Sequence, residues 1–123
     1  MSISLSGSSM PVASPVEQYK VASAFGGANE AVVITLAADP TLRYRVFGLS
    51  WSFSGAALTT SRSTLTVNAV EAWNQIAGAS ADKDRRNFRL PIVSGLNQAV
   101  VLTVPAVPAI SGACNLFYEE VTA

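Results

Sequence analysis

Apolar residues recur at every second position in short runs along this chain. The longest run is residues 42–53 (LRYRVFGLSWSF), where they occupy even positions up to Val46 and odd positions from Phe47 onward. A period of two is that of a strand with one buried face. The change of face beside Gly48 predicts a β-bulge that turns both apolar sets toward the core. A strand buried on both faces is the alternative.

Other runs have the same β-branched or alternating composition. They lie at residues 31–36, 58–70, 88–93, 99–104 and 113–121. With a strand near residue 20, the chain has about seven or eight short strands. The chain has 123 residues, enough for one domain with one core. We therefore predict a single, compact, all-β domain, a sandwich or barrel, over residues 16–123.

Two segments are ambiguous. Ser14-Pro15-Val16-Glu17 matches a helix capping box, but Tyr19, Val21 and Phe25 share one face of a strand. We favour a strand there because the rest of the chain is β-like. Residues 71–83 lose the alternation, and we expect a helical turn or a loop.

Residues 1–15 read as a flexible N-terminal arm. Six of the first fourteen residues are serine, a composition that buries little apolar surface by itself. Ile3 and Leu5 alternate with serines, so we expect this part to become a strand when it docks on a neighbouring protein.

The composition predicts an assembly. Half of the residues are hydrophobic, but only 13% are charged, against about 25% in average globular chains. So few charges leave apolar surface uncovered on a monomer, which favours a homo-oligomer. The formal net charge is zero, which gives no reason to expect a nucleic acid or an anionic membrane as partner.

The residue types needed for most catalytic and metal sites are missing. There is no histidine and only one cysteine, Cys114. Ser-His-Asp catalysis and zinc binding are therefore not expected, and we predict no enzyme activity, cofactor or metal. Cys114 alternates with Leu116 and Tyr118, as a small buried hydrophobe would. The uncharged stretch between Arg89 and Glu119 contains three prolines, which argues against a membrane helix.

Two features are candidate protein interfaces. Residues 82–89 (DKDRRNFR) hold six charges, and we read them as a loop whose basic side chains contact a partner: Lys83, Arg85, Arg86 and Arg89. A purely solvated loop is the alternative. Trp73 lies in the irregular segment, where an indole ring could anchor a subunit contact or complete the core.

Two stretches resemble small virion proteins of tailed bacteriophages. They are RYRVFGLS and SFSG at residues 43–55, and LNQAVVLTV, a glycine turn and LFYEEV at residues 96–121. The resemblance implies a β-sandwich or jelly roll, a capsid decoration (cement) or related head or tail role, and a trimer bound to the major capsid protein. It implies no catalytic residues, and residues 71–89 do not fit it and look like an insertion.

The expected function is therefore a structural role in the virion, decorating and stabilising the phage head. The alternative is a carbohydrate- or receptor-binding sandwich, for which Trp73 and residues 82–89 would supply the contacts.

Overall fold

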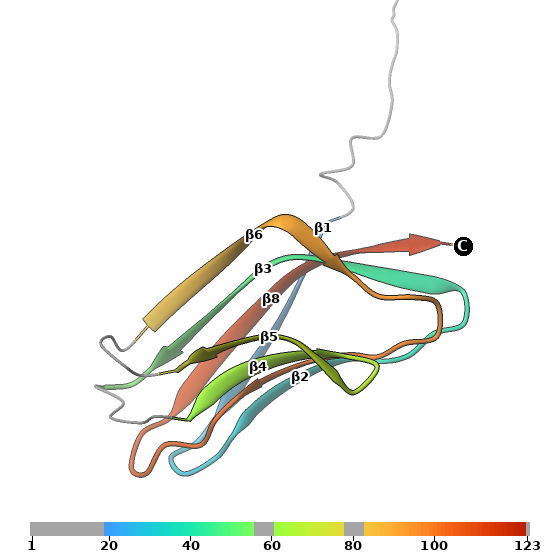
Figure 1. Cartoon of the computed structure of the whole chain (residues 1–123). Helices are drawn as coiled ribbons and strands as arrows, with labels where there is room; N and C mark the ends of the chain where they lie inside the picture. The colour runs from blue at the N-terminus through green and yellow to red at the C-terminus, as the bar shows by residue number, and fades with distance from the viewer. Residues whose placement is uncertain (1–18, 56–60, 78–82, 123) are drawn as a thin grey trace, which may run out of the picture.

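The computed structural model describes residues 19–55, 61–77 and 83–122, and all regular structure in them is β. Eight strands follow one another along the chain (Figure 1). They are β1 (Tyr19–Gly26), β2 (Val32–Leu36), β3 (Leu42–Phe53), β4 (Arg62–Val67), β5 (Val70–Ile76), β6 (Lys83–Val93), β7 (Val100–Val104) and β8 (Gly112–Thr122).

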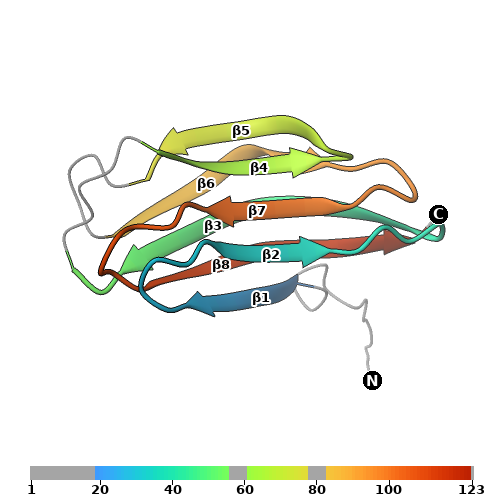
Figure 2. The ribbon, with the colours of Figure 1, turned by 90° about the horizontal axis from the view of Figure 1, so that it is seen from below.

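The strands form two four-stranded antiparallel sheets. Sheet A has the order β1-β8-β3-β6, and sheet B has the order β2-β7-β4-β5. Figure 2 shows them as two stacked layers, with sheet B in front of sheet A. The predicted all-β sandwich is confirmed.

The order of the strands is that of a jelly roll. β1 pairs with β8, β2 with β7, β3 with β6 and β4 with β5, so the chain runs as one long antiparallel ribbon. Pairing of β3 with β8 and of β4 with β7 wraps this ribbon into two sheets. This is the eight-stranded double-sheet arrangement of jelly-roll domains.

The core lies between the sheets and contains the inward-facing residues of the alternating runs. Leu49 and Leu116 of sheet A and Leu65 and Leu102 of sheet B are fully buried. Trp51 is 2% exposed, and its indole Nε1 donates a hydrogen bond to the Ala77 carbonyl oxygen at 2.8 Å. The indole N–H of Trp51, the largest side chain in the core, therefore has a hydrogen-bond partner.

The predicted bulge in β3 is confirmed. The register with both neighbouring strands shifts between Val46 and Gly48, and Val46 and Leu49 are both fully buried. One residue departs from the expectation. Phe47 is only partly buried and lines a groove on the outer face, because the bulge turns this one position away from the core.

The region around β5 differs from the sequence prediction. β5 (Val70–Ile76) is a strand, so the expected helical turn is wrong within the described residues. The expected strand at 58–70 is interrupted by a two-residue hairpin turn at Asn68-Ala69. Both residues have positive φ, 51° and 65°, as a type I′ turn requires. The usual glycine is missing at this turn, which hid it from sequence analysis.

The structure also tests the predictions for the first strand and for the basic segment. The segment from Tyr19 to Gly26 is strand β1, so the predicted strand is confirmed there and the alternative helix is not formed. The basic segment is strand β6 from Lys83, so its assignment to a loop is wrong. Residues 1–18, including Ile3 and Leu5, lie outside the described residues.

Candidate interaction surface

Strand register arranges the outer face of sheet A in rows, because paired residues of neighbouring strands point to the same face. One row contains Val21, Phe117, Gly48 and Asn87, from β1, β8, β3 and β6 in turn. Residues far apart in sequence thus become neighbours on one surface.

A groove of about 350 Å³ follows this row. Its lining consists of Lys20, Val21, Phe47, Gly48, Arg85, Asn87 and Phe117. Gly48 has no side chain, so the middle of the row is open, and Phe47 stands beside it because the bulge turns it outward. The walls are therefore mainly apolar and aromatic.

An arginine guanidinium group lies over each of the two phenylalanine rings. The Arg45 Cζ atom lies 5.4 Å from the ring centroid of Phe47, and the Arg85 Cζ atom lies 5.4 Å from that of Phe117. These distances are within the range of cation–π contacts. Positive charge and aromatic surface therefore occur together along the groove.

Arg45 is held in place by a carboxylate. Its Nη1 lies 2.8 Å from Glu119 Oε1, and the Glu119 side chain is only 6% exposed. A largely buried carboxylate needs such a partner, so this pair fixes one end of the groove. Because Arg45 is paired and lies over Phe47, its guanidinium is preorganised.

A polar row borders the groove toward the other end. The Ser23 hydroxyl donates to Asn115 Oδ1 at 2.6 Å, and Asn115 Nδ2 donates to the Ser50 hydroxyl at 3.2 Å. This chain of hydrogen bonds crosses β1, β8 and β3, so the outer face offers polar groups beside an apolar hollow.

The edge strand β1 has its larger side chains on the solvent side. Val21 is 58% exposed and Phe25 is 87% exposed, whereas the partly buried residues between them are Ala22 and Ala24. A half-buried strand ordinarily has the opposite distribution. The exposed apolar surface therefore continues from the groove along β1.

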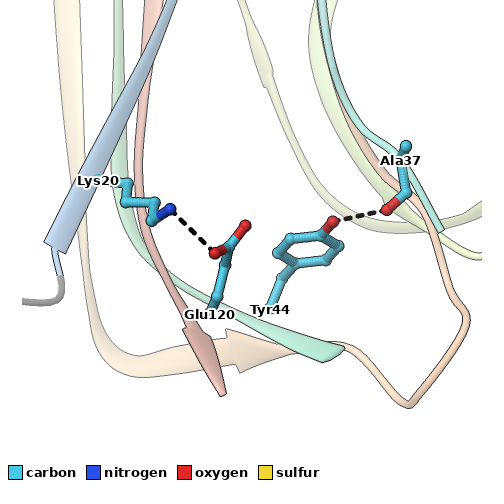
Figure 3. Close-up of polar contacts among 4 residues, drawn as sticks. All are labelled: Lys20, Ala37, Tyr44 and Glu120. Carbon is cyan, nitrogen blue, oxygen red and sulfur yellow. Dashed lines mark hydrogen bonds and ion pairs between the residues drawn. The ribbon is translucent and has the colours of Figure 1, made fainter. Parts of the chain in front are cut away.

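A second ion pair lies at one end of the sandwich (Figure 3). Lys20 Nζ is 3.0 Å from Glu120 Oε1, and the nearby Tyr44 hydroxyl donates to the Ala37 carbonyl oxygen at 2.6 Å. Burial, and then the charge of Glu120, raise the pKa of Tyr44 above 10.0. The neighbours Glu119 and Glu120 have separate basic partners, so they do not form a carboxylate pair.

The predicted basic cluster is divided between two faces of β6. Arg85 lies opposite Ser50 and lines the groove, whereas Arg86 lies opposite the buried Leu49. Arg89 is exposed in the stretch 88–91 that bulges opposite Phe47. Lys83 is the first residue of β6, and its side chain is outside the description.

Trp73 fills the side of the sandwich between β5 and β6. Its ring centroid lies 5.7 Å from that of Trp51 and 6.1 Å from that of Phe88. The indole is partly buried against the core, so only part of it is accessible to a partner. Cys114 is buried, as predicted, and burial raises the pKa of its thiol to about 11.

Sequence analysis did not identify Val21, Phe47, Asn87 or Phe117 as members of one site. The available signal was the apolar character of Val21 and Phe25 on a strand whose other face holds alanines. The grouping itself depends on the pairing of β1 with β8, which joins the two ends of the described chain.

The described residues contain no group of three or more acidic or cysteine side chains that could hold a metal ion. Within the same residues, no helix is long and apolar enough to cross a membrane. No protein-family model, curated protein or solved structure matches this chain.

Proposed function

We propose that this chain is a structural protein of a tailed-phage virion. In this role it is a non-enzymatic decoration or cement protein that forms a homotrimer through the outer face of sheet A, and the trimer binds the major capsid protein. The observation that carries the proposal is the groove along Val21, Phe117 and Gly48, with guanidinium groups over its aromatic walls.

The chemistry of this surface suits a protein partner. Aromatic and arginine side chains are enriched at the centres of protein interfaces, and lysine and glutamate are depleted there. The sparse charge of the whole chain agrees with a surface that is covered in an assembly. Jelly-roll domains are also a recurrent architecture of viral capsids, which adds support by analogy of fold.

Carbohydrate binding has less support. It relied on Trp73 as a stacking platform, but that ring packs between Trp51 and Phe88. Sugar platforms need an accessible aromatic face. Of the two functions, the structural role is therefore the better supported.

The test is attachment to undecorated heads of the phage that encodes the chain. The purified chain should co-sediment with these heads. Arg85→Ala should weaken attachment about tenfold, or ~1.4 kcal/mol, because an interfacial arginine is lost from the groove wall. Arg86→Ala is the matched control, since it lies on the other face of β6, and it should bind as the native chain does. Failure of the native chain to co-sediment would contradict the proposal.

A further inference from the structure

The groove begins where the described chain begins. Lys20 and Val21 line it, and Tyr19 is the first described residue. Eighteen residues precede Tyr19. We propose that residues 2–6 (SISLS) of this N-terminal segment bind in the groove, with Ile3 and Leu5 against the aromatic walls. This inference does not depend on the virion role, and within the proposed trimer the docked residues 2–6 form part of the contact at the outer face of sheet A.

The segment and the groove match in chemistry. Residues 2–6 alternate serine with isoleucine and leucine, so an extended segment has one apolar and one polar face. The apolar face fits against Phe47 and Phe117, and the serines fit beside the polar row of Ser23, Asn115 and Ser50. The other apolar stretch, Met10-Pro11-Val12, has a proline that removes one backbone donor.

The absence of charge in the segment also favours docking. The first charged residue of the chain is Glu17, so residues 2–6 bring no ion of their own into the groove. A charged peptide would need to pair each of its ions there. Two cations at the groove already have carboxylate partners, because Arg45 pairs with Glu119 and Lys20 with Glu120.

The length of the segment permits this contact. Residues 7–18 connect the docking stretch to β1, and twelve extended residues span about 40 Å at most. That is enough to turn back onto the same copy, because the groove starts next to Tyr19. It is also enough to reach the groove of an adjacent copy, where a head-to-tail contact of this kind closes a ring.

Disulfide trapping in the full chain tests the proposal. The variant Ile3→Cys/Val21→Cys joins the segment to the groove, and Ile3→Cys/Val33→Cys is the matched control. Val33 is 48% exposed on β2, so the control moves the second cysteine to the outer face of the other sheet. The native Cys114 does not compete, because it is buried and its thiol pKa is about 11.

With oxidised glutathione as the oxidant, the Val21→Cys pair should close at least ten times faster than the Val33→Cys pair. A disulfide-linked product with the mass of one chain places the segment in the groove of the same chain. A product with the mass of two or more chains places it in the groove of a neighbouring copy, and both results support the proposal. Equal rates for the two pairs, with circular dichroism of the native type, would overturn it. Equal rates would leave the proposed virion role intact, because attachment to heads is measured separately.

Discussion

Position 48 must be glycine because the neighbouring strand β6 leaves no room for a side chain. A Cβ atom there would lie 2.7 Å from the carbonyl oxygen of Arg86, a distance that forces the two strands apart. The same absence of a side chain opens the middle of the groove. One residue therefore serves both the pairing of β3 with β6 and the shape of the outer face.

Gly48→Ala should destabilise the fold by about 1–3 kcal/mol, as overpacking of a close contact does. Gly55→Ala is the control, since nothing lies within 4 Å of a Cβ atom at that position. Urea denaturation of the two variants beside the native chain measures the difference. Equal free energies of unfolding for the two variants would contradict this prediction, because they would mean that a Cβ atom at position 48 fits between β3 and β6.

The Cys114 thiol should make stability depend on pH in the alkaline range. Its pKa is 9.0 in an unfolded chain and about 11 in the fold, because burial disfavours the thiolate. Between these values the unfolded state has lost the proton that the folded state keeps, so stability falls as pH rises. The loss is on the order of 2 kcal/mol from pH 9 to 11.

Comparison with Cys114→Ala isolates this effect, because Tyr44 and Lys20 titrate in both proteins. The free energy of unfolding should fall more steeply from pH 9 to 11 in the native chain than in the variant. Parallel pH profiles would mean that the thiol is accessible to solvent in the fold.

At the scale of elements, the central strands and the edge strands β1 and β2 were predictable, whereas the edge strand β5 and the first half of the edge strand β6 were not. Residues 42–53 match β3 over their whole length because both neighbours of this strand are in the sheet and one face is in the core. β5 and the first half of β6 lie at sheet edges, where charged and polar residues replace the alternation. The groove could not be predicted, because its rows depend on the register of distant strands.

One substitution in the β4–β5 hairpin turn should increase the stability of the fold. Ala69 has φ of 65°, a left-handed conformation that costs a residue with a Cβ atom about 1–2 kcal/mol. Ala69→Gly removes this strain but adds freedom to the unfolded chain, so we expect a net gain of about 0.5–1 kcal/mol. Ala72→Gly, at an exposed position within β5, should instead lower stability. Thermal denaturation of both variants tests the sign, and a loss of stability in Ala69→Gly would contradict the turn assignment.

At the scale of the molecule, the two outer faces of the sandwich are expected to behave differently. The outer face of sheet A has the groove and the exposed Val21 and Phe25, whereas Val33 and Thr35 are the exposed residues of β2 on sheet B. If the outer face of sheet A is the interface, a charge placed there should disrupt the assembly. The same charge on sheet B should have no effect on it.

Sedimentation of the purified chain at micromolar concentration tests this claim most directly. The native chain should sediment as a closed oligomer, a trimer of the 12.8 kDa protomer. Val21→Asp should shift it to monomer, because the apolar contact would then bury an unpaired charge, and Val33→Asp should leave the oligomer unchanged. A native chain that sediments as a clean monomer, or an oligomer that survives Val21→Asp unaltered, would contradict the account.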